Sequence, residues 1–103
     1  MKIIQELYDM IDEELDDACK YIKCAIKKKE DNGSLAQTFY TLSTDEMKHA
    51  TMLHDEVVKI VNEYRNKGEE VPETMQAVYD YLHDKKIEKA NRIKVYMEQY
   101  KEM

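Results

Sequence analysis

Apolar residues recur at alternating steps of three and four along most of the chain, the spacing that places them on one side of an α-helix. Helix-breaking residues interrupt this pattern in only two places, at Asn32 to Ser34 and between Asn66 and Pro72. Two interruptions predict three helices. These cover about residues 2–31, 35–67 and 72–101.

The residues at the interruptions predict how the helices begin and end. Gly33 is expected to adopt the left-handed conformation that ends the first helix, and Ser34 with Gln37 three residues later is typical of a capping box that opens the second. Gly68 is expected to end the second helix in the same way as Gly33. Pro72 suits the first turn of the third helix.

Three polar residues interrupt the apolar stripes of the first two helices. Glu14 interrupts the stripe of the first helix, which comprises Ile4, Leu7, Ile11, Ala18, Tyr21 and Ala25 and is widened by Tyr8, Leu15 and Ile22. Glu46 and His49 interrupt that of the second, which comprises Leu35, Phe39, Leu42, Leu53, Val57, Ile60 and Tyr64. The third helix has a weaker stripe, broken by Lys86, that comprises Met75, Val78, Leu82, Ala90, Ile93, Met97 and Tyr100.

Composition supports an all-α fold. The 103 residues suit a single domain over 1–103, and two glycines, one proline and 37% charged residues leave little material for strands and turns. The short first connection predicts an antiparallel helical hairpin, followed by a long third helix. The net charge of −6 disfavours a nucleic-acid surface, which needs clustered Lys and Arg.

Cysteine usage and hydropathy indicate where the protein works. Cys19 and Cys24 lie five residues apart on one helix, which turns them away from each other. No apolar run approaches the ~20 residues that a membrane span requires. We therefore expect a reduced, soluble, cytoplasmic protein that does not enter a membrane.

The polar interruptions predict a metal site. A carboxylate buried without compensation costs several kcal/mol, and a bound cation is the most direct compensation for Glu14. Glu46 and His49 are three residues apart, so both side chains project towards one spot, and carboxylate with imidazole suits iron, manganese or zinc. Counted from a turn at Gly33, Glu14 lies 19 residues back and Glu46 13 residues forward, which predicts a stagger of about six residues or ~9 Å.

The combination of Glu14, Tyr21 seven residues later and Glu46-x-x-His49 on the next helix resembles the ferritin-like superfamily, which includes ferritins, bacterioferritins and rubrerythrins. The resemblance covers about residues 5–65 and is closest to the short encapsulated-ferritin type, with one Glu and one Glu-x-x-His per chain. It implies a four-helix core completed by a homodimer or higher oligomer, with two iron ions per dimer and ferroxidase activity.

The same resemblance implies roles for individual residues. Glu14, Glu46 and His49 would be metal ligands, with Glu46 as the bridge, and no catalytic residue is expected beyond them. Tyr21 would hydrogen-bond a ligand carboxylate. Manganese or zinc could replace iron at such ligands.

Two other interpretations remain open at this stage. The chain could be a helical dimer or adaptor without metal, in which Glu14 and His49 form a buried ion pair. It could instead be a monomeric three-helix bundle in which Lys86 neutralises Glu14 or Glu46. His54 and His83 are expected to be partly exposed surface residues rather than ligands. No phosphate-binding loop or nucleophile–base pair is visible, so hydrolase chemistry has no support.

Overall fold

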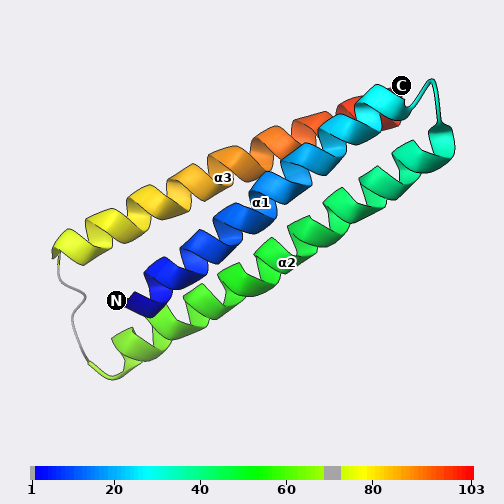
Figure 1. Cartoon of the computed structure of the whole chain (residues 1–103). Coiled ribbons are helices and arrows are strands. Elements are labelled where there is room, and N and C mark those ends of the chain that lie inside the picture. The colour runs from blue at the N-terminus through cyan, green and yellow to red at the C-terminus, as the bar shows by residue number, and fades with distance from the viewer. Residues whose placement is uncertain (1, 69–72) are drawn as a thin grey trace.

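The chain folds into three long helices that form a rod of 56 × 18 × 18 Å. A computed structural model describes the backbone of residues 2–68 and 73–103, and the side chains of 2–68 and 76–103. Helices α1 and α2 run antiparallel as a hairpin, and α3 returns alongside α1 in the same direction as α1 (Figure 1). The helices are α1 (Lys2–Lys28), α2 (Gly33–Asn66) and α3 (Glu73–Glu102). The predicted all-α fold with three helices is therefore confirmed.

The turn between α1 and α2 differs from the prediction. The side chain of Asn32 accepts a hydrogen bond of 3.1 Å from the backbone N–H of Leu35, so Asn32 caps α2 and the helix begins at Gly33. The predicted cap at Ser34 is therefore wrong. The expected left-handed Gly33 is wrong too, because only Gly68 has a positive φ, of 74°, among the described residues. Gly68 thus ends α2 as predicted, whereas Pro72 lies outside the described residues.

Small side chains allow α1 and α2 to pack closely. On α2 the buried positions Ala36, Ser43, Ala50 and Val57 recur every seven residues. The hydroxyl of Ser43 is completely buried and donates a hydrogen bond of 2.7 Å to the carbonyl oxygen of Ala18 on α1. This small-residue seam faces a fully or almost fully buried row on α1, made up of Ile4, Tyr8, Ile11, Leu15, Ala18, Ile22 and Ala25.

The position of this seam corrects the predicted buried face of α2. Leu35 and Leu42 were expected in the core, but their side chains are 37% and 36% exposed. The core instead takes the smaller residues next to them in the sequence, Ala36 and Ser43. Periodicity favoured the larger apolar residues, whereas close packing of two helices selects small ones. Leu35 and Leu42 consequently lie on a face of the hairpin that the described part of the chain leaves partly exposed.

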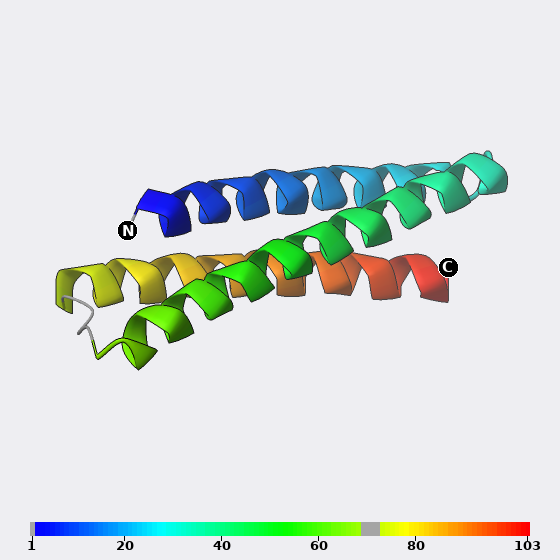
Figure 2. The same ribbon diagram turned by 90° about the horizontal axis from the view of Figure 1, so that it is seen from below.

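Helix α3 packs mainly on α1 and touches α2 only lightly. In Figure 2, α2 runs obliquely, from the α1 side at the hairpin turn towards the α3 side at its other end. Ile93 and Tyr100 of α3 are buried, and the Tyr100 ring stacks on Tyr40 of α2 with ring centroids 4.8 Å apart. Val78, which was expected in the stripe, is 56% exposed. No helix in the described parts of the chain is both long and apolar enough to cross a membrane.

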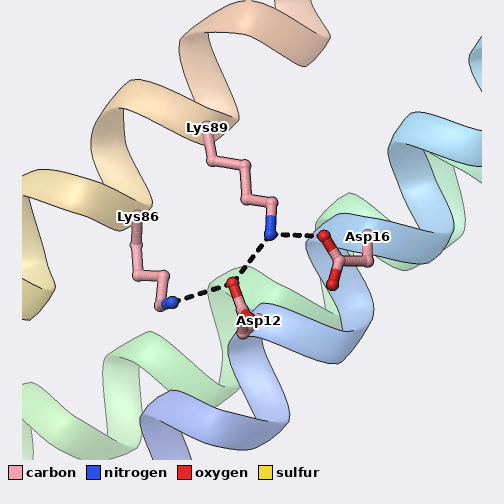
Figure 3. A network of polar contacts seen from close by, with 4 residues as sticks. All are labelled: Asp12, Asp16, Lys86 and Lys89. Carbon is pink, nitrogen blue, oxygen red and sulfur yellow. Dashed lines mark hydrogen bonds and ion pairs between the residues drawn. The ribbon is translucent and has the colours of Figure 1, made fainter.

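Opposite charges attach α3 to α1. The Nζ atoms of Lys86 and Lys89 each lie 2.8 Å from Asp12 Oδ1, and Lys89 also pairs with Asp16 (Figure 3). Hydrogen bonds from Lys86 and Lys89 lower the pKa of Asp12 below its usual 3.8. One carboxylate thus holds two cations of α3, and this network fixes where α3 lies along α1.

The seam predicts a strong size limit at Ser43. We expect Ser43→Leu to destabilise the protein by about 2–3 kcal/mol, because a completely buried position between two close helices has no room for three more carbons. Ser43→Ala, which loses only the hydrogen bond, should cost about 1 kcal/mol. Denaturant unfolding followed by circular dichroism measures both, and equal stabilities of the two variants would contradict the close packing.

The network at Asp12 predicts a pH-dependent contribution to stability. Because folding lowers the pKa of Asp12, its ionised form stabilises the folded protein at neutral pH, and this contribution disappears as the pH falls below 3.8. Asp12→Asn should therefore be less stable than wild type at pH 7, by no more than about 1 kcal/mol because solvent screens the pairs. The difference should shrink as the pH falls below 3.8 and be smallest at the lowest pH at which both proteins stay folded. A difference that does not shrink would contradict this account.

Candidate metal centre

Glu14 of α1 and Glu46 and His49 of α2 come together midway along the hairpin. One potential ligand atom from each residue lies within 4.8 Å of the other two. The Nδ1 atom of His49 is 3.5 Å from Glu14 Oε2 and 3.6 Å from Glu46 Oε2. The structure therefore gathers in one place the three residues that the sequence marked as candidate ligands.

The start and end of the two helices explain this alignment. Glu14 lies 14 residues before the end of α1 at Lys28, and Glu46 lies 13 residues after the start of α2 at Gly33, so the two face each other. The predicted stagger of six residues is wrong because the turn is centred before Gly33, not at it. The seam holds this register, since the bond from Ser43 to Ala18 lies about one helical turn from the cluster.

Distances in the cluster suit ligands of a shared ion better than hydrogen bonds. At 3.5 and 3.6 Å, the contacts of His49 with the two carboxylates are longer than the 2.7–3.2 Å or so of an N–H···O hydrogen bond. Two ligands bound at about 2.1 Å in a tetrahedral site are themselves about 3.4 Å apart. A small inward movement of Glu14 and Glu46 would therefore allow all three atoms to bind one cation.

Exposure shows that the cluster is open on one side. The side chains of Glu14 and Glu46 are 29% and 19% exposed, whereas that of His49 is 53% exposed. An ion pair as exposed as this contributes little to stability, so pairing of His49 with Glu14 is a weak reason for the arrangement. The buried pair of the metal-free interpretation is not present within one chain.

No lysine of α3 neutralises the cluster among the described residues. Lys86, the candidate counter-charge, binds Asp12 instead. Asp12 is two residues before Glu14, which places it about 160° away around α1. The monomeric interpretation therefore lacks the contact on which it depended, and Glu14 and Glu46 remain two acidic groups held close together.

The three residues correspond in type to half of a two-metal ligand set. Carboxylate-bridged di-metal bundles take a Glu from each of two helices and Glu-x-x-His from each of two others. Here α1 carries Glu14, and α2 carries Glu46 and His49. Oxygen and imidazole donors of this kind suit iron, manganese or zinc. With one side open, these three donors can hold a cation and leave positions for a further ligand.

Tyr21 lies on the same side of α1 as Glu14 but two helical turns away, about 10 Å along the axis. Its ring stacks on Phe39, with centroids 6.2 Å apart, and its hydroxyl makes no hydrogen bond to any described residue. Its role beside a ligand carboxylate stays a prediction.

His54 and His83 do not join the cluster but contact each other. His54 Nε2 lies 3.2 Å from His83 Nδ1, and both residues are half-buried between α2 and α3. Sequence patterns do not predict this pairing, because the two residues are 29 positions apart on different helices and neither interrupts an apolar stripe clearly. Only the placement of α3 reveals it.

Neither the family models, nor the curated proteins, nor the solved structures compared with this chain match it. The ligand of the cluster therefore has to be inferred from the donor atoms of Glu14, Glu46 and His49.

Removal of one charge from the cluster should not lower the stability of the metal-free protein, but it should remove the stabilisation by a bound metal. We expect Glu46→Gln to leave the metal-free protein as stable or slightly more so, because two neighbouring carboxylates repel each other. Mn²⁺ should raise the melting temperature of the wild type and have little effect on Glu46→Gln. Thermal unfolding with and without Mn²⁺ measures this. An equal rise in both proteins would mean that Mn²⁺ binds elsewhere.

Proposed function

We propose that this chain is a ferritin-like, iron-binding protein in which two copies complete a di-iron ferroxidase site. The observation that carries the proposal is the position of Glu14, Glu46 and His49, in the middle of an apolar face that α3 does not cover. Half of a di-metal ligand set thus lies where a second copy can supply the other half. A cytoplasmic setting, in which the free thiols of Cys19 and Cys24 stay reduced, is part of the proposal.

Large apolar side chains surround the three donors on the open face. On the side of α1 that bears Glu14, the exposed residues Ile3 and Met10 lie within about 40° of it around the helix, three turns and one turn away along the axis. Near Glu46 on α2, the exposed residues Leu35 and Leu42 lie within the same angle. The half-buried residues Leu7, Tyr21, Phe39, Leu53 and Ile60 continue this face along both helices.

A second copy of the chain is the partner that this face suits. Two hairpins that pack open face to open face would form a four-helix core and remove these apolar side chains from water. In a two-fold arrangement, each Glu14–Glu46–His49 set would meet its own copy across the axis. The acidic groups would then be buried, and bound cations would compensate them.

The chemistry follows from two ferrous ions held side by side as substrates. Each ferrous ion gives up one electron, and together the two reduce one dioxygen to hydrogen peroxide with uptake of two protons. His49 would act as a neutral nitrogen ligand and Glu46 as the carboxylate shared between ions, with Glu14 completing the set. The carboxylates favour the ferric product, because its extra charge strengthens its attraction to them.

Loss of Glu46 should abolish iron oxidation. We expect Glu46→Ala to slow the rise in near-ultraviolet ferric absorbance after aerobic addition of ferrous iron by about tenfold or more, since loss of groups that merely support a ligand already costs about 10–100-fold. Glu63→Ala is the matched control, because Glu63 is an exposed glutamate of the same helix. Equal rates for wild type and Glu46→Ala would overturn the ferroxidase proposal.

A charge on the open face should prevent pairing. We expect Leu42→Glu to shift the protein from dimer to monomer in light scattering and to lose iron oxidation with it. Met52→Glu is the control, since Met52 is 65% exposed and lies about 120° away from Glu46 around α2. A wild type that dimerises but neither binds nor oxidises iron would instead favour the metal-free helical dimer. A wild type that stays monomeric with iron would exclude both.

A further inference from the structure

Two histidines contact each other away from the open face, between α2 and α3. His54 Nε2 and His83 Nδ1 are 3.2 Å apart, and their rings are roughly parallel, at 29° with centroids 5.1 Å apart. These two residues form one of the few contacts between α2 and α3. They lie near a hollow of about 250 Å³ that both of them line.

The separation of the two nitrogens matches the spacing of two ligands on one ion. Nitrogens bound at about 2.1 Å to one metal lie about 3.0 Å apart at right angles and about 3.4 Å apart in a tetrahedral site. The observed 3.2 Å falls between these values. It also lies at the long limit of a hydrogen bond, which directs one ring nitrogen at the other, so both rings would have to turn for their nitrogens to face one ion.

Neighbouring groups hold the two rings in place, and burial favours the neutral form of His54. The Tyr79 ring lies parallel to that of His83, at 8° with centroids 6.0 Å apart, and the edge of Tyr79 meets the buried ring of Tyr8 on α1. Burial, with a smaller contribution from His83, lowers the pKa of His54 below its usual 6.5, although Asp55 opposes this shift. Neutral imidazole is the form that binds metal.

The hollow offers room for the remaining ligands of an ion. Its walls are mostly apolar and come from all three helices, including Ile11, Leu15, Met47, Ala50, Ile87 and Ala90. Lys86 and Lys94 also line it, and the ammonium of Lys86 is bound to Asp12. Two imidazoles beside such a space can hold a metal that keeps water or a small anion at its other positions.

We infer that His54 and His83 form a second metal site, which binds one transition-metal ion of the imidazole-preferring class, Zn²⁺, Ni²⁺ or Cu²⁺, and links α2 to α3. Each ring binds the ion as a neutral imidazole: the ring that carries its proton on the facing nitrogen transfers it to its other nitrogen through solvent. Two nitrogen donors favour these ions over manganese, which prefers oxygen. This inference does not depend on the proposed di-iron site, because it uses none of its residues.

The composition of the chain allows a clean test. His49, His54 and His83 are the only three histidines, so in His49→Ala every imidazole belongs to the proposed pair. Cu²⁺ added at one equivalent per chain to His49→Ala should show two coordinated imidazole nitrogens in electron paramagnetic resonance with spin-echo detection. The further change His83→Gln should leave at most one and weaken Cu²⁺ binding by about 100-fold or more. His54→Gln is the reciprocal variant and should do the same.

A second measurement tests the link between helices. Zn²⁺ should raise the melting temperature of His49→Ala, because it binds the folded arrangement of α2 and α3, and should not raise that of His49→Ala with His83→Gln. Circular dichroism confirms that each variant remains helical. Equal Cu²⁺ affinity with and without His83, or a signal from a single imidazole in His49→Ala, would overturn the inference. So would an equal effect of Zn²⁺ on both melting temperatures.

Discussion

Close contact between α1 and α2 is the constraint on which the rest of this structure depends. The helices approach through Ala36, Ser43 and Ala50, and a buried hydroxyl on one helix bonds a carbonyl of the other. A larger side chain anywhere along this seam would separate the helices or shift them along each other. Because Glu14 and Glu46 come from different helices, their proximity is a direct result of that register.

The same close contact determines what remains exposed. Small residues in the seam turn the larger ones, such as Leu35 and Leu42, towards the side of α2 that bears Glu46. Helix α3 covers another side of α1, where its Lys86 and Lys89 pair with Asp12. The hairpin therefore has one face that α3 covers. Its other face is apolar at the edges and acidic in the middle. This second face is the reason for proposing a partner copy.

Sequence reasoning predicted the number and type of elements, the buried row on α1 and the grouping of Glu14, Glu46 and His49. The elements and the buried row depend on local spacing, which helical periodicity determines, whereas the meeting of Glu14 with Glu46 also depends on the register of the two helices, which the sequence placed six residues out. Prediction from the sequence failed where two residues could take the same structural role, and where the structure depends on contacts between distant residues. Asn32 and Ser34 were both suitable caps, and only the folded turn shows that Asn32 caps the helix.

The buried side of α2 and the pair of His54 with His83 show the second kind of failure. Hydrophobicity ranks leucine above serine, but helix packing at this interface selects by size, so the true core residue was overlooked. The contact between the two histidines depends on where α3 lies. The apolar stripe of α3 is too weak to predict that position from the sequence. The roles of all these groups in metal binding remain proposals, as do the dimer and the resemblance to ferritin-like proteins.

Because the bond from Ser43 to Ala18 aligns the two helices, the acidic cluster contributes little to their alignment. The residues that align the two helices and the residues that offer ligand atoms are different residues, about one helical turn apart. Evolution, or a protein engineer, can therefore exchange the donors for others, or for plain hydrocarbon, while the scaffold keeps its shape. A single backbone of this kind can therefore keep its shape with or without a set of ligand side chains.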